Sequence, residues 1–194
     1  MFTDRSLLFR ACLVLSLFFW LLSIQSVFYW NPSEGAHELN VQIEVDASVD
    51  QVYNYLGNSE KAKSWSVYVS SINALNAEAY KDGEAGSIRR CYVKGSQNAQ
   101  FWDEEILINE KNHLRQLSIF NLNNFLLTAD HLITEQRYSE NEEGGCLLEF
   151  SLFFKENPSF IDQLKMHFAS RIVQNIFEQN LHNIKLDIEM KANA

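Results

Sequence analysis

A chain of 194 residues has room for one folded domain with a short appendage. Hydrophobic residues make up 46% of the sequence and aromatic residues 13%, which is enough to fill a core and argues against global disorder. The formal charge of −9 and the lack of lysine or arginine runs argue against a nucleic-acid partner, because phosphate binding needs a basic surface.

An apolar segment precedes the domain. Residues 11–30, ACLVLSLFFWLLSIQSVFYW, carry no charge, and a helix of this length spans about 30 Å, the thickness of a bilayer core. Aromatic residues crowd its far end, as they do at a membrane interface. We therefore expect a transmembrane helix at 11–30. A cleaved signal peptide and a soluble core helix are the alternatives.

Positive charge is distributed unevenly around this segment. Arg5 and Arg10 precede it, and no lysine or arginine follows before Lys61. The positive-inside rule then predicts that residues 1–10 are cytoplasmic and that the globular domain lies on the non-cytoplasmic side of the membrane.

The remaining chain divides into a linker, a domain and a short tail. Residues 31–38, NPSEGAHE, are polar and contain proline and glycine, which is typical of a linker. The folded domain is expected over residues 39–190, with a tail at 191–194.

The domain is predicted to begin with one strand and two short helices. Apolar and polar residues alternate from Leu39 to Asp46, as in a half-buried strand. Ser48 can cap a helix that stops at Gly57, and residues 59–69 are predicted to form a second helix anchored by Trp65.

About six antiparallel strands and one long helix are predicted to follow. The expected strands are residues 70–79, 86–94, 100–109, 113–121, 126–139 and 146–154, separated by turns. The apolar residues of the helix at 159–190 are predicted to form one broad stripe: Ile161, Leu164, Phe168, Ile172, Ile176, Leu181, Ile184 and Ile188. A sheet with one apolar face and a helix to cover it make an α+β domain.

This order of elements, with three short motifs, resembles the START-like (SRPBCC) superfamily, and most closely its polyketide cyclase/dehydrase and lipid-transport family. The motifs are IEVDASVDQVYNYL at 43–56, GSIR at 86–89 with WDEEI at 102–106, and NLHNIKLDIE at 180–189. The resemblance covers residues 39–190. It implies a helix-grip fold, in which a curved antiparallel sheet of about seven strands wraps around a long C-terminal helix. It also implies a cavity for a lipid, sterol, polyketide or other apolar molecule.

Four residues are candidate ligand-binding residues: Arg89, Trp102, Glu104 and His131. Trp102 and Glu104 share one strand face, so if that face points inward Glu104 is a carboxylate near the cavity. Arg89 or Arg90 could balance its charge. Such a pair could orient the polar end of a ligand or act in acid–base catalysis, and a structural ion pair is the simpler alternative.

Other polar residues carry weaker signals. Tyr92 and Tyr138 could donate hydrogen bonds to a ligand or simply pack in the core. The cysteine spacing fits no zinc site. Cys91 and Cys146 could form a disulfide, but they are expected to be buried free thiols, because cysteine is often a small core hydrophobe. No cofactor and no metal are expected, and no sequence motif demands catalysis.

The sequence therefore favours a membrane-anchored START-like domain that binds a hydrophobic small molecule or lipid under its long helix. One alternative is an enzyme that resembles polyketide cyclases or dehydratases. Another is a non-catalytic interaction module of the cell envelope, which would have a filled interior and an exposed apolar patch.

Overall fold

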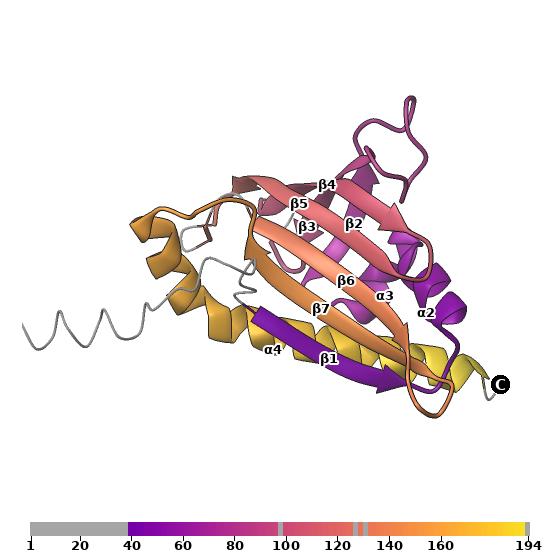
Figure 1. Cartoon of the computed structure of the whole chain (residues 1–194). Coiled ribbons are helices and arrows are strands. Elements are labelled where there is room, and N and C mark those ends of the chain that lie inside the picture. The colour runs from indigo at the N-terminus through magenta and orange to yellow at the C-terminus, as the bar shows by residue number, and fades with distance from the viewer. Residues whose placement is uncertain (1–38, 97–98, 126–127, 130–131, 193–194) are drawn as a thin grey trace, which may run out of the picture. The chain divides into compact units, whose positions relative to one another are not determined.

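The computed structural model describes residues 39–96, 99–125, 128–129 and 132–192 (Figure 1). The expected membrane span at 11–30 lies outside these residues and stays a prediction. In the described part of the chain, no helix has both the length and the apolar character needed to cross a membrane.

The helices and strands follow the predicted order. One strand, three short helical segments, six strands and one long helix succeed one another: β1 (Leu39–Val45), α2 (Val49–Leu56), the 3-10 helix η1 (Ser59–Lys61), α3 (Ala62–Trp65), β2 (Val69–Ala74), β3 (Ile88–Val93), β4 (Phe101–Glu110), β5 (Leu114–Asn123), β6 (Leu132–Glu140), β7 (Cys146–Phe154) and α4 (Phe160–Ala192).

The seven strands form a single antiparallel sheet in the order β1-β7-β6-β5-β4-β3-β2. Strand β1 forms one edge of the sheet and pairs with β7, and α4 packs along β1 (Figure 1). This confirms the predicted helix-grip arrangement of a curved sheet around a long C-terminal helix.

Helix α2 begins at a capping box. The Ser48 hydroxyl accepts a hydrogen bond from the backbone N–H of Gln51, and the Gln51 side chain accepts one from the backbone N–H of Ser48 at 2.9 Å. These reciprocal bonds satisfy two donors that the first turn of a helix leaves free. The connection between β1 and α2 is short because this cap starts the helix only a few residues after β1 ends.

The predicted second helix at 59–69 is too long. Its helical part ends at Trp65, because the Ser66 hydroxyl accepts hydrogen bonds from the backbone N–H groups of Tyr68 and Val69 at 3.2 and 3.0 Å. The Asn180 side chain of α4 accepts another from Val67 at 2.8 Å. Side chains thus replace the helical acceptors, and Val69 already belongs to β2.

The hydrophobic core lies between the sheet, α2 and the C-terminal half of α4. Val45, Val52, Leu148, Leu181 and Ile184 are among its fully or almost fully buried members. Because this core gathers β1, β7 and both helices at one end of the domain, the other half of α4 is left to cover a less tightly filled region.

The prediction of one apolar stripe along α4 is wrong. Leu181 and Ile184 are 2% and 0% exposed, whereas Phe168 and Ile172 are 61% and 60% exposed. Ile172 and Leu181 are nine residues apart, which is about two and a half helical turns, so they project from opposite sides of the helix. The helix therefore has an inner apolar face and, in its N-terminal half, an outer stripe formed by Ile161, Leu164, Phe168 and Ile172, of which Ile172 also borders a cavity between α4 and the sheet.

Candidate ligand-binding cavity

A cavity of about 510 Å³ lies between the sheet, α3 and the N-terminal half of α4. Alternation along β3 to β7 directs one residue in two toward it, which is why strands far apart in sequence contribute to one wall. Its apolar lining includes Leu117, Ile119, Leu132, Leu152, Val173 and Ile176. Polar residues are interspersed in this lining and come from β3, β4, β6, α4 and the connecting segments.

Aromatic side chains build one wall of the cavity. The rings of Trp65 and Phe150 meet edge to face at 6.5 Å, and Phe150 meets Phe177 in the same manner at 5.7 Å. All three residues line the cavity. Edge-to-face contacts hold aromatic rings in defined positions, so this wall presents a preformed apolar surface.

Arg89, Trp102 and Glu104 form the polar group of the cavity wall. The Arg89 Nε donates to Glu104 Oε2 at 2.9 Å, and the Trp102 Nε1 donates to Glu104 Oε1 at 2.8 Å. A second guanidinium nitrogen of Arg89 donates to the Ser59 hydroxyl at 3.0 Å. The carboxylate is thus held at both oxygens, and the structure fulfils the condition that Glu104 faces the cavity, with Arg89 rather than Arg90 as its cation.

The ion pair is sheltered from water. The side chains of Arg89 and Glu104 are 12% and 11% exposed. Burial lowers the pKa of Arg89, but the attraction of the Glu104 carboxylate outweighs it and raises the pKa above its ordinary value. Arg89 therefore stays charged inside the cavity wall.

Arg90 has a different partner. It forms two hydrogen bonds to the carboxylate of Asp103, at 2.7 and 3.0 Å, on the opposite face of the sheet. Burial raises the pKa of Asp103, and the hydrogen bonds from Arg90 and Asn121 outweigh burial and lower it. The register pairs Arg89 with Glu104 and Arg90 with Asp103, so neighbouring ion pairs alternate between the two faces.

The sequence-predicted site residues have different outcomes. The structure brings Arg89, Trp102 and Glu104 together in the cavity wall. His131 lies outside the described residues. Tyr138 is buried and donates a hydrogen bond to the Gln136 side chain at 2.7 Å, so it supports a lining residue from behind.

Sequence reasoning missed Arg115 and Gln136. Gln136 lines the cavity, and Arg115 donates a hydrogen bond to its Oε1 at 3.2 Å. The available signal was the phase of Arg115, which precedes Leu117 and Ile119 on the same face of a predicted strand. A charged residue in phase with an apolar face is an indication of burial.

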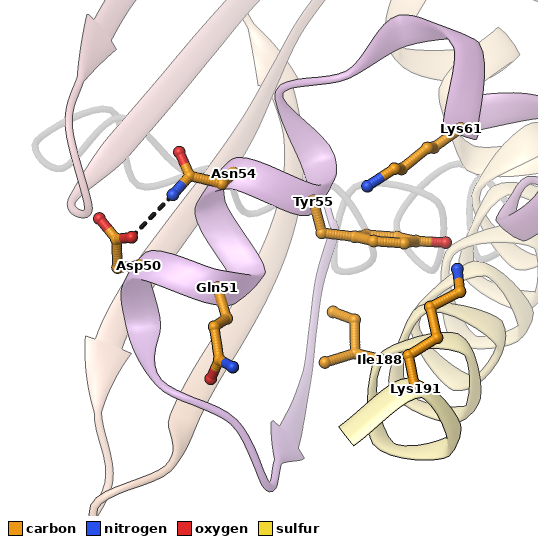
Figure 2. Close-up of a pocket in the computed structure, with 7 residues that line it drawn as sticks. All are labelled: Asp50, Gln51, Asn54, Tyr55, Lys61, Ile188 and Lys191. Carbon is orange, nitrogen blue, oxygen red and sulfur yellow. Dashed lines mark hydrogen bonds between the residues drawn. The ribbon is translucent and has the colours of Figure 1, made fainter. Parts of the chain in front are cut away.

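A second hollow, of about 340 Å³, lies on the surface between α2 and the C-terminal end of α4 (Figure 2). The ring of Tyr55 lies between the ammonium groups of Lys61 and Lys191, at 4.9 and 5.2 Å from the ring centre, and its hydroxyl donates to Asp187 at 2.6 Å. The polar and charged groups in this hollow thus have partners within the protein, and their contacts hold the C-terminal end of α4 against α2. We assign this hollow a structural role.

Comparisons with known proteins agree with this geometry. A family model described as polyketide cyclase/dehydrase and lipid transport matches residues 36–189. Comparison of the sequence with curated proteins gives no match.

Several solved structures share the fold at low sequence identity. A protein from Nitrosospira multiformis is 12% identical, with a TM-score of 0.59 over 80% of this chain and 99% of that one. Norcoclaurine synthase from Thalictrum flavum, in complex with dopamine and hydroxybenzaldehyde, is 10% identical, with a TM-score of 0.58 over 78% and 86% of the two chains. The di-domain ARO/CYC StfQ from the steffimycin biosynthetic pathway is 13% identical, with a TM-score of 0.58 over 80% of this chain and 51% of that one. At such identities the likeness shows the fold alone.

Proposed function

Because the chain belongs to the polyketide cyclase/dehydrase and lipid-transport family, we propose that it binds a hydrophobic small molecule or lipid in the cavity between the sheet and α4. We further propose that residues 11–30 anchor this START-like domain in a membrane. The observation that carries the binding function is the cavity itself, whose wall is mostly apolar and includes the ordered polar group of Arg89, Trp102 and Glu104.

The volume and lining of the cavity suit an apolar ligand. At about 510 Å³ it falls within the range of about 300–1,000 Å³ that is usual for small-molecule sites. Transfer of apolar ligand surface from water into such a site contributes about 25 cal/mol per Å². Arg89, Trp102 and Glu104 would then set the orientation of the ligand's polar end.

The same contacts favour binding over catalysis. An enzyme of the cyclase or dehydratase kind needs an inward acid or base, and Glu104 faces the cavity. Both of its oxygens, however, accept hydrogen bonds from Arg89 and Trp102, so the carboxylate is already engaged by partners within the protein. We therefore assign Glu104 an orienting role. An open cavity also favours ligand binding over an interaction module with a filled interior.

The outer stripe of α4 supports the membrane part of the proposal. Four large apolar side chains, Ile161, Leu164, Phe168 and Ile172, are exposed on one face of this helix beside the cavity. An exposed apolar helix face of this kind is typical of a surface that meets lipid or another protein.

The start of β1 lies on the chain between the proposed membrane helix at 11–30 and the rest of the domain. Leu39, the first described residue, pairs with Leu152 near the end of β7, and only five residues separate β7 from α4. A linker of eight residues, 31–38, reaches at most about 29 Å. A linker of this length would keep the domain close to a bilayer that holds residues 11–30. By the positive-inside rule the domain would lie on the non-cytoplasmic side.

The binding function is tested with the full chain in mild detergent. The protein is incubated with isotope-labelled hexadecanol, freed of unbound ligand by gel filtration, extracted and analysed by mass spectrometry. The matched control is Ala169→Phe, which fills the cavity from α4 and carries the same detergent. We expect retention of close to one hexadecanol per wild-type chain and little by the variant. Equal retention by the two folded proteins would contradict the proposal.

The membrane part is tested in liposomes in a Cys12→Ser background. A polarity-sensitive fluorophore attached at Phe168→Cys, on the outer stripe, should emit as in a lipid interface. The same fluorophore at Gln179→Cys, an exposed position farther along α4, should emit as in water. Water-like emission from both positions would contradict a membrane contact. Labelling of Glu143→Cys, in the exposed turn before β7, by a membrane-impermeant maleimide in intact cells tests the sidedness.

A further inference from the structure

Arg115 is a buried cation on the concave side of β5. It is 3% exposed, and within the described residues no carboxylate forms an ion pair with its guanidinium. Burial of a charge without a counter-charge is costly, because the interior solvates it poorly. Such an arginine is therefore uncommon in a domain of this size.

The hydrogen-bond and ring partners of Arg115 among the described residues are neutral. One terminal nitrogen, Nη1, donates to Gln136 Oε1 at 3.2 Å and to the Tyr138 hydroxyl at 3.4 Å. The guanidinium carbon lies 4.8 Å from the centre of the Tyr53 ring. The Nε is buried and has no hydrogen-bond partner among the described residues. Amide, hydroxyl and ring contacts solvate a cation in part and leave its charge unbalanced.

Arg115 lies directly behind the cavity lining. Gln136, its cross-strand partner, lines the cavity, and so does Leu117, the next residue of β5 on the same face. The Gln136 amide, which accepts a hydrogen bond from the guanidinium, thus links Arg115 to the cavity wall. An acceptor that enters from the cavity can replace this amide as the partner of Arg115.

Among the described residues, the charges around the cavity leave a surplus of one. Arg89 and Glu104 balance each other, and Arg115 adds one positive charge. Glu135 also borders the cavity, but its carboxylate bonds to Arg137 and Gln116 on the other face of the sheet. The chain as a whole carries −9, so the buried surplus is local and opposite in sign to the surface.

We propose that the ligand is an anionic amphiphile, with an apolar body in the cavity and a carboxylate or phosphate ester head held by Arg115 and Gln136. A charged acceptor forms stronger hydrogen bonds with a guanidinium than a neutral amide does. The buried Nε1 of Trp65, a cavity-lining residue, also has no acceptor among the described residues and is a further donor for such a ligand. This inference rests on the ligand-binding function proposed above and names its ligand class.

The test compares three labelled sixteen-carbon probes: hexadecanoate, hexadecyl phosphate and hexadecanol. The full chain in mild detergent receives an equimolar mixture at neutral pH, and retained probes are quantified after gel filtration, with retention by Ala169→Phe subtracted as background. We expect at least one of the two anions to be retained at least about tenfold over the alcohol. The ratio of hexadecanoate to hexadecyl phosphate distinguishes a carboxylate from a phosphate head.

Two variants assign the preference to Arg115. Arg115→Met keeps most of the side-chain volume and removes the charge, and Gln136→Glu supplies an internal carboxylate beside Nη1. In both variants the ratio of retained anion to retained hexadecanol, measured on the same folded protein, should fall about tenfold. Gln136→Glu should also raise the melting temperature, because it pairs a buried charge. If Arg115→Met fails to fold, as judged by circular dichroism, Gln136→Glu alone decides.

The outcomes separate this inference from the proposed function. Retention of all three probes in equal amounts, or an anion preference that survives in the folded variants, overturns the role of Arg115 and leaves apolar binding intact. Retention of none of the probes above the Ala169→Phe background overturns both.

Discussion

Arg89 and Glu104 face each other across β3 and β4, with Nε and Oε2 2.9 Å apart, while Arg90 and Asp103 make the adjacent pair on the other face of the sheet. Two ion pairs of the same chemistry therefore lie in different environments. The first belongs to the cavity wall, and the second to the outside of the sheet.

Removal of one partner of the inner pair should be far more damaging than removal of both. Arg89→Met leaves the Glu104 carboxylate buried without a counter-charge and should lower the free energy of unfolding by about 3–5 kcal/mol. The double variant Arg89→Met/Glu104→Gln should recover most of this loss. Chemical denaturation of Arg89→Met, Glu104→Gln and the double variant measures the coupling free energy between Arg89 and Glu104. Additive effects would contradict a tight pair.

The outer pair should make stability depend on acidic pH. The pKa of Asp103 is lowered in the folded protein, so its contribution is present above the unfolded value of about 3.9 and is lost as the pH falls through the lower folded value. Asp103→Asn should cost about 1.5–3 kcal/mol at neutral pH. When the pH is lowered below about 4, the melting temperature of Asp103→Asn should fall less than that of the wild type. The exposed acid Glu142, changed to Gln, serves as the control and should follow the wild-type profile.

The thiols of Cys91 and Cys146 should be inert in the folded protein. Both are free and buried, as predicted from the sequence, and burial raises the pKa of Cys91 well above its ordinary value and that of Cys146 to about 11. In a Cys12→Ser background, a thiol-specific chromogenic reagent at pH 8 should react with neither, and with both in denaturant. Rapid reaction of either thiol in the folded state would show that the surrounding structure opens enough to admit the reagent, and would contradict the prediction. Glu143→Cys provides a freely reactive thiol for comparison.

The two faces of α4 should respond oppositely to the same substitution. Ile184→Asp places a carboxylate in the core and should lower the free energy of unfolding by more than about 3 kcal/mol. Phe168→Asp, on the exposed outer stripe, should change it by no more than about 0.5 kcal/mol. Denaturation of both variants under identical conditions measures the difference. Equal destabilisation would mean that the outer stripe is packed against something.

Much of the fold could be predicted because its signals are local. The alternation of Leu39 to Val45 and of Cys146 to Phe154 reports strands that are buried on one face, and both appear where expected. Ser48 and Gln51 form a cap through contacts within one turn. The boundary at Trp65 could not be predicted, because the acceptor that turns the chain there includes Asn180, more than a hundred residues away.

The candidate site was only partly predictable. Alternation placed Trp102 and Glu104 on one face, but it left Arg89 and Arg90 as equal candidates for the partner of Glu104. The register between β3 and β4 decides between them. Arg115 stayed unnoticed because its isolation depends on what the neighbouring strands β4 and β6 and helix α2 bring near it.

The sequence by itself determined the order of helices and strands and the alternation along each strand, since these follow from periodicity and capping within short stretches, and its resemblance to a known family implied the helix-grip class. Only the tertiary structure decided which arginine faces the cavity, that α4 has two apolar faces, and that Arg115 is a buried charge without a counter-charge. Register, packing and charge balance depend on residues that are distant in the chain, and folding alone brings them within contact.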